Sequence, residues 1–219
     1  MTAKFNYKLV GMKSESCATV GRPREFDLEE ALSAALKVFW RKGYEAASLT
    51  ELTEAMGITR PSLYCAFGNK EELFKKALDL YEREKLSFID GALSAPTGYQ
   101  AIERLWLGGV DVHTDPETPG CMGVNSVLAC QGVASESVRD ELVNRRLDFE
   151  ARLRERLQQA QTDGDLPADS DVAALTTYCI TVSQGLALQA TMGAKRETLL
   201  MVVRTALQAI PRARVLQPA

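Results

Sequence analysis

The chain has 219 residues, of which 46% are hydrophobic and 25% charged, with a formal net charge of −3. These values are those of a protein with a packed core, and they exclude a disordered or fibrous chain. Five scattered cysteines form no CxxC pair, so reduced thiols are expected rather than a disulfide framework or a structural zinc site.

The charge is divided unevenly along the chain. Residues 1–70 hold ten Lys or Arg against eight Asp or Glu, whereas the remaining residues hold sixteen against twenty-one. A mildly basic start on an acidic body is compatible with nucleic-acid binding near the N-terminus. No apolar run reaches the length of a signal-peptide core or a membrane span, so a cytoplasmic protein without membrane contact is expected.

Apolar residues recur three and four positions apart through almost the whole chain, which predicts an all-α protein. Four polar residues are expected to cap the first four helices: Asp27, Ser48, Thr59 and Asn69. Three glycines are expected to end the first three: Gly43, Gly57 and Gly68. The fourth helix is expected to run from Lys70 to about Leu93, and it joins the N-terminal helices to the rest.

Five further helices are expected, near residues 99–113, 121–130, 137–161, 171–192 and 195–210. The third of these carries acid-first pairs four residues apart: Glu141/Arg145, Asp148/Arg152 and Glu150/Arg154. Such pairs stabilise an exposed helical face.

The stretch "TRPSLYCAFGNK" from Thr59 follows a short helix after the turn "GIT", which is the arrangement of a helix-turn-helix. Leu63 and Phe67 would fasten its helix to Leu36 and Leu52. Four side chains then point outward, with Lys70 at the start of the next helix: Arg60, Ser62, Tyr64 and Cys65. They suit phosphate and base contacts in a major groove, although the same helices could simply pack on the body.

Residues 21–81, "GRPREFDLEEALSAALKVFWRKGYEAASLTELTEAMGITRPSLYCAFGNKEELFKKALDLY", resemble the DNA-binding domain of the TetR family of transcriptional repressors. The resemblance implies a homodimer in which each subunit places a three-helix head on a helical body with an effector pocket. It also implies which residues lie against DNA: Ser48, Thr50, Arg60, Pro61, Ser62, Tyr64, Cys65 and Lys70.

Arg22 and Arg24 precede the first helix, where they would either enter a minor groove or belong to a solvated tail. Met12 offers a second start for translation. The expected division is a flexible extension at residues 1–20, a helix-turn-helix domain at 21–69, and an effector-binding and dimerisation domain at 70–219.

The last two helices are rich in apolar and small residues, so they are expected to pair with a second copy as well as pack on the monomer. An effector pocket is expected between the middle helices. Its candidate residues are equally compatible with plain core: Trp106, Val110, Met122, Asn125, Leu128, Phe149 and Tyr178.

No nucleophile with a base, carboxylate pair or phosphate loop indicates an enzyme, and no cofactor or metal is expected. The leading hypothesis is a repressor that binds a palindromic operator and is released by a small molecule, through a shift of the helix from Lys70 to Leu93. The alternatives are a redox- or metal-responsive regulator that uses cysteines, a constitutive architectural DNA binder, and a helical dimerisation module without DNA activity.

Overall fold

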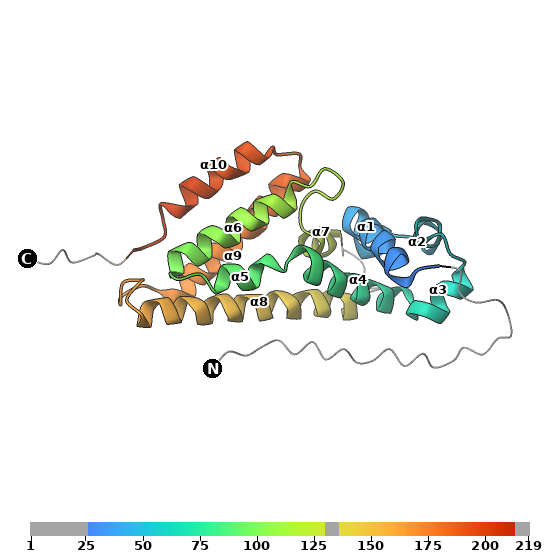
Figure 1. The fold of residues 1–219 in the computed structure, drawn as a ribbon, viewed down its shortest axis with the longest axis horizontal. Helices are drawn as coiled ribbons and strands as arrows, with labels where there is room; N and C mark the ends of the chain where they lie inside the picture. The colour runs from blue at the N-terminus through green and yellow to red at the C-terminus, as the bar shows by residue number, and fades with distance from the viewer. Residues whose placement is uncertain (1–25, 130–135, 213–219) are drawn as a thin grey trace, which may run out of the picture.

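The computed structural model describes residues 26–129 and 136–212, in which ten α-helices and no strand are present. The first three helices, α1 (Leu28–Ala46), α2 (Leu49–Met56) and α3 (Arg60–Phe67), lie at one end of the molecule (Figure 1). The body follows, and the bounds of its helices are α4 (Lys70–Lys85), α5 (Phe88–Leu93), α6 (Gly98–His113), α7 (Met122–Ala129), α8 (Glu136–Thr162), α9 (Val172–Thr191) and α10 (Arg196–Leu207).

The expected caps are confirmed, because capping depends on chemistry within one helical turn. The Asp27 carboxylate accepts from the N–H of Glu29 at 2.7 Å, and the Asn69 side chain accepts from that of Glu72 at 2.9 Å. Ser48 forms a reciprocal capping box with Glu51. All four helix starts therefore lie where the sequence predicts them.

Two helix ends differ from the prediction. Gly43 has φ 72° and interrupts the helical conformation, but α1 resumes and continues to Ala46. The single helix expected from Lys70 to Leu93 is divided after Lys85, and α5 begins at Phe88. The Phe88 ring lies against Gly108 of α6, so close that a Cβ atom at Gly108 would come within 2.3 Å of it. The break thus turns α5 onto α6.

Two hydrophobic cores divide the molecule. The first core contains residues of α1, α2, α3 and α4, together with Met122 of α7 and Val138 and Leu142 of α8. The other joins α5, α6, α8, α9 and α10 around Trp106. Helices α4 and α8 both run along the length of the molecule and contribute residues to the first core (Figure 1). The N-terminal helices therefore share a hydrophobic core with the body.

No described helix is both long enough and apolar enough to cross a membrane.

Candidate DNA-binding surface

Helices α2 and α3 are joined by a tight turn at residues 57–59. Gly57 takes the left-handed conformation (φ 65°, ψ 28°), and its N–H donates to the carbonyl oxygens of Glu54 and Thr53. Thr59 then caps α3, where its hydroxyl accepts from the N–H of Ser62 at 3.4 Å. These local interactions fix the angle between the two helices, as a helix-turn-helix requires.

Leu63 and Phe67 are buried in the first core together with Leu36 and Leu52, as the sequence predicts. Because residues four apart share one helical face, their burial turns the opposite face of α3 outward. Tyr64 is 49% exposed, and Arg60 and Cys65 are exposed as well. The outward face of α3 therefore presents a guanidinium, a phenol and a thiol beside the half-buried Ser62.

The Arg60 side chain is held in place by α2. Its Nη2 donates to the Thr50 hydroxyl at 2.7 Å, which reduces the number of conformations that the arginine samples before it binds a partner. Ser48 and Thr50 are exposed at the start of α2. Both helices thus contribute polar groups to one surface.

The negative charge of a carboxylate at the same surface is compensated by its neighbours. Hydrogen bonds from Lys42 and from the Ser48 N–H and hydroxyl hold the pKa of Glu51 at about 2. The capping box directs this negative charge toward Lys42 and the helix start. An anionic partner that approaches Ser48 therefore meets a compensated charge.

Lys70 lies on the flank of this surface and is tied to the head. Its Nζ donates to the Glu45 carbonyl oxygen at 3.4 Å and lies 4.5 Å from the centre of the Tyr44 ring. Partial burial lowers the pKa of the ammonium, and the Glu45 charge opposes this shift. Pro61 occupies the first turn of α3 and is exposed, whereas Arg22 and Arg24 lie outside the described residues.

The seven residues suggested for an effector pocket do not form one group. Trp106, Val110, Phe149 and Tyr178 share the second core, where the Trp106 and Tyr178 rings meet edge to face at 6.1 Å. Met122 belongs to the first core, and Leu128 is 53% exposed on α7. Asn125 lies between these regions.

A hydrogen-bonded junction connects α1, α7 and α9 through Asn125. Its amide nitrogen lies 3.4 Å from the carbonyl oxygens of Trp40 and Pro119, and its amide oxygen accepts from the Thr191 hydroxyl at 2.9 Å. Asn125 therefore contacts the head, the loop at residues 114–121 and one of the last two helices of the body.

The Gly120 carbonyl oxygen completes this junction. It accepts from Trp40 Nε1 at 3.2 Å and lies 3.2 Å from His113 Nδ1, so this nitrogen carries the proton of the neutral ring. Burial lowers the pKa of His113 to about 4 against the opposing effect of that carbonyl. The end of α6 is thereby joined to α1 by a neutral histidine at pH 7.

The described cysteines lie in three different places. Cys65 is exposed on α3, Cys121 accepts a hydrogen bond from the Tyr81 hydroxyl at 3.4 Å, and burial raises the pKa of Cys179 to about 12. Cys130 lies outside the described residues. Among residues 26–129 and 136–212, no group of three His, Cys, Asp or Glu side chains is placed to hold a metal ion.

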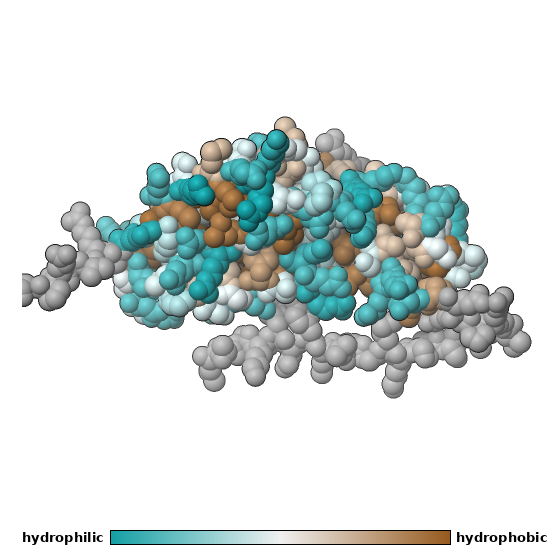
Figure 2. Space-filling view, turned by 45° about the horizontal axis from the view of Figure 1, so that its top comes forward, coloured by the Kyte–Doolittle hydropathy of each residue, from teal (hydrophilic) through white to brown (hydrophobic). Residues whose placement is uncertain are grey.

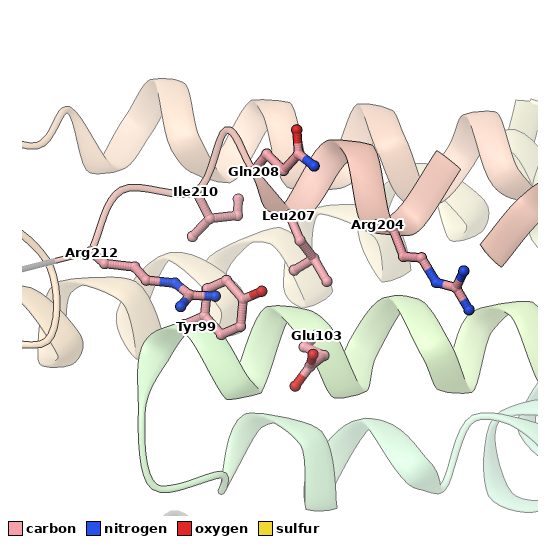
Figure 3. Close-up of a pocket in the computed structure, with 7 residues that line it drawn as sticks. All are labelled: Tyr99, Glu103, Arg204, Leu207, Gln208, Ile210 and Arg212. Atoms are coloured by element: carbon pink, nitrogen blue, oxygen red, sulfur yellow. The ribbon is translucent and has the colours of Figure 1, made fainter. Parts of the chain in front are cut away.

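Sequence reasoning missed a cavity of about 540 Å³ between α6 and α10, lined in part by Tyr99, Glu103, Arg204 and Arg212 (Figure 3). The only signal for this cavity in the sequence is the presence of two arginines, Arg204 and Arg212, near the end of a segment that is poor in charge. Neither α6 nor α10 alone indicates that an open pocket lies between the two helices.

A capped helix-turn-helix with an exposed polar face, built into a larger helical body, defines the class of DNA-binding regulators. Residues 31–77 match the family described as bacterial regulatory proteins, tetR family, and residues 100–207 match the tetracyclin repressor-like C-terminal domain. The chain belongs to the TetR family of transcriptional regulators.

Similar proteins extend over nearly the whole chain. The transcriptional repressor ComR of Escherichia coli (strain K12) is 33% identical over 196 residues, which cover 87% of this chain and 92% of ComR. A cysteine mutant of the TetR family transcriptional regulator CifR, solved in complex with a 26-base-pair double-strand operator DNA, is 44% identical with a TM-score of 0.82, over 87% of this chain and 100% of CifR. This protein is accordingly a DNA-binding transcriptional regulator and not an enzyme.

Proposed function

We propose that this protein represses transcription as a dimer that binds a palindromic operator through α3 and leaves it when a small-molecule effector binds the body. The observation that carries the proposal is the outward face of α3, with Arg60 held by Thr50 and Tyr64 half exposed. The solved complex of CifR with operator DNA supports a common mode of binding.

The proposed contacts follow from the chemistry of each side chain. Arg60 pairs with a guanine edge or a phosphate, and Ser62 and Tyr64 donate to phosphate oxygens. Lys70 supplies a positive charge at the start of α4, where backbone N–H groups also attract phosphate. The full set of proposed contact residues is Ser48, Thr50, Arg60, Pro61, Ser62, Tyr64, Cys65 and Lys70, with Arg22 and Arg24 as minor-groove contacts.

Dimerisation through α9 and α10 is supported by apolar side chains that the single chain leaves in solvent. Leu188 of α9, Met192 directly after that helix, and Met201 and Val202 of α10 are exposed. Hydrophobic surface also gathers on this side of the body in Figure 2. Two copies joined here would offer two α3 helices to one face of a duplex, with half-sites about 34–36 Å apart or a multiple of that spacing.

Effector release requires that the ligand prefer the dimer geometry that does not fit DNA. Two sets of contacts can transmit a structural change from the body to the head. They are the hydrogen bonds at Asn125 and Gly120 and the core shared by α1 and α4. The proposed domains are a helix-turn-helix domain at 21–69 and an effector-binding and dimerisation domain from residue 70. A protein that acts on DNA in this way is expected to work in the cytoplasm.

Replacing Tyr64 tests the proposed surface. We expect Tyr64→Ala to weaken binding to a DNA duplex, selected by the parent protein from a random library, by about tenfold or more, since a hydrogen bond to a charged group contributes about 1.5–3 kcal/mol. The measurement is fluorescence anisotropy of the labelled duplex at fixed salt, together with the oligomeric state by light scattering.

Two further variants serve as controls. Tyr64→Phe separates the hydroxyl from the ring, and Val143→Ala truncates an exposed side chain on α8, far along the chain from the head. Val143→Ala should bind the duplex as the parent does. Equal affinity of Tyr64→Ala and the parent for the selected duplex would show that α3 does not read DNA through this face.

A further inference from the structure

The cavity between α6 and α10 has the size of a small-molecule site. Its volume of about 540 Å³ falls within the range of about 300–1,000 Å³ that such sites occupy. Tyr99 and Glu103 line it from α6, and Arg204, Leu207, Gln208 and the segment at Ile210 and Arg212 line it from the side of α10 (Figure 3).

Two guanidinium groups make this cavity suited to an anion. The Arg212 guanidinium lies 3.6 Å from the centre of the Tyr99 ring, and this stacking leaves the N–H groups at its edge available to a ligand. Among the residues that the structure describes, neither Arg204 nor Arg212 forms an ion pair with a carboxylate. Arg212 is therefore free to bind an acid beside Tyr99, and Arg204 adds a second unpaired positive charge at the other end of the lining (Figure 3).

The remainder of the lining selects for an apolar ligand with one negative charge. Leu207 and Ile210 are buried and offer aliphatic surface beside the Tyr99 ring. Glu103 opposes the two arginines, so the lining as a whole carries one net positive charge. A single carboxylate matches this charge, whereas a dianion would meet repulsion from Glu103.

The cavity is also connected to the DNA-binding head. Helix α6 begins at Gly98 beside the cavity and ends at His113, which meets the Gly120 carbonyl oxygen together with Trp40 of α1. Its other wall, α10, carries Met201 and Val202 on the surface proposed for dimerisation. A ligand that separates α6 from α10 would therefore act on both the head and the dimer.

We propose that this cavity binds an apolar monocarboxylate and is the effector site of the protein, with Arg212 as the group that binds the carboxylate and Arg204, at the other end of the lining, as a further positive charge (Figure 3). Its role as effector site rests on the proposed function. The binding of a carboxylate to the cavity does not rest on the proposed function, because this binding is measured without DNA.

Calorimetric titration of the full chain with octanoate and 4-butylbenzoate tests the binding site. The double variant Arg204→Gln, Arg212→Gln should bind either probe at least tenfold more weakly, because it loses the charge-assisted hydrogen bonds from Arg212 and the positive charge of Arg204. Arg139→Gln, which alters an exposed arginine on α8, should bind as the parent does. Both arginines of the double variant are exposed, and its thermal unfolding should match that of the parent.

The uncharged 1-octanol and the phosphate monoester octyl phosphate complete the set of probes. If 1-octanol and octyl phosphate both bind more weakly than octanoate, the site is one for a monocarboxylate. If octyl phosphate binds more tightly than octanoate, the site is one for phosphate esters and the proposal of a monocarboxylate is wrong. Failure of both carboxylates to bind the parent, or equal binding to the double variant, would overturn the proposal.

The effector role is measured separately as release of the selected duplex by octanoate. A parent protein that binds the carboxylate and holds DNA equally well in its presence would refute the effector role while the repressor function stands. A parent protein that selects no DNA at all would refute the proposed function, whereas the calorimetric result on the cavity would remain valid.

Discussion

Gly120 shows how single residues decide the geometry between head and body. Its φ of 81° lies in the left-handed region, and its carbonyl oxygen meets Trp40 and His113. The caps at Ser48 and Asn69 could be predicted from the sequence, because their partners lie three residues away. The junction could not, since Asn125 and Trp40 are 85 residues apart in the chain.

Replacing Gly120 with alanine should destabilise the folded protein. A Cβ atom there would come within 1.9 Å of the Thr191 Oγ1 atom and 3.1 Å of the Ala187 carbonyl oxygen, in addition to the strain of a positive φ. We expect a loss of about 2–4 kcal/mol, measured by urea unfolding.

Gly164→Ala is the matched control for this measurement. Gly164 has φ 82°, but no atom lies within 4 Å of its Cβ position, so only the backbone strain of about 1–2 kcal/mol applies. If the two variants unfold at the same urea concentration, the contact between Gly120 and Thr191 does not restrain the loop.

At the scale of elements, ion pairs attach α4 to α8. Arg145 of α8 lies 2.6 Å from Asp79 and 2.9 Å from Glu82 of α4, and 2.7 Å from Glu141 on its own helix. Periodicity and acid-first pairs predicted α8 and the Glu141 contact, because both are local. The sequence could not predict the partners on α4, nor the division between α4 and α5, because the packing of Phe88 on Gly108 joins distant segments.

Arg145→Gln should loosen the attachment of α4. The variant leaves Asp79, Glu82 and Glu141 close together without their cation, and the arginine side chain is only 21% exposed. After allowance for solvent screening, we expect a loss of about 1–2 kcal/mol in urea unfolding, which shrinks in high salt.

Arg146→Gln removes a neighbouring arginine that pairs with Glu150 at 2.8 Å and whose side chain is 43% exposed. Its cost should stay below about 1 kcal/mol. Equal costs for the two variants would mean that the charges on α4 contribute nothing beyond an ordinary surface pair.

At the scale of the whole molecule, the sequence predicted a helix-turn-helix head on a helical body, and the structure and the similar proteins confirm this architecture. The outward face of α3 followed from the spacing of Leu63 and Phe67. The cavity did not follow, because it requires the first turns of α6 to approach the end of α10, more than a hundred residues further along the chain.

The central claim is that a dimer places two α3 helices on one face of an operator. Hydroxyl-radical footprinting on the selected duplex measures this arrangement directly. We expect two protected regions related by two-fold symmetry, with centres about 10–10.5 base pairs apart or a multiple of that spacing. At the lowest protein concentration that protects both regions with the parent, both should be weakened in Tyr64→Ala. One protected region without symmetry, or an unchanged footprint in Tyr64→Ala, would contradict the account.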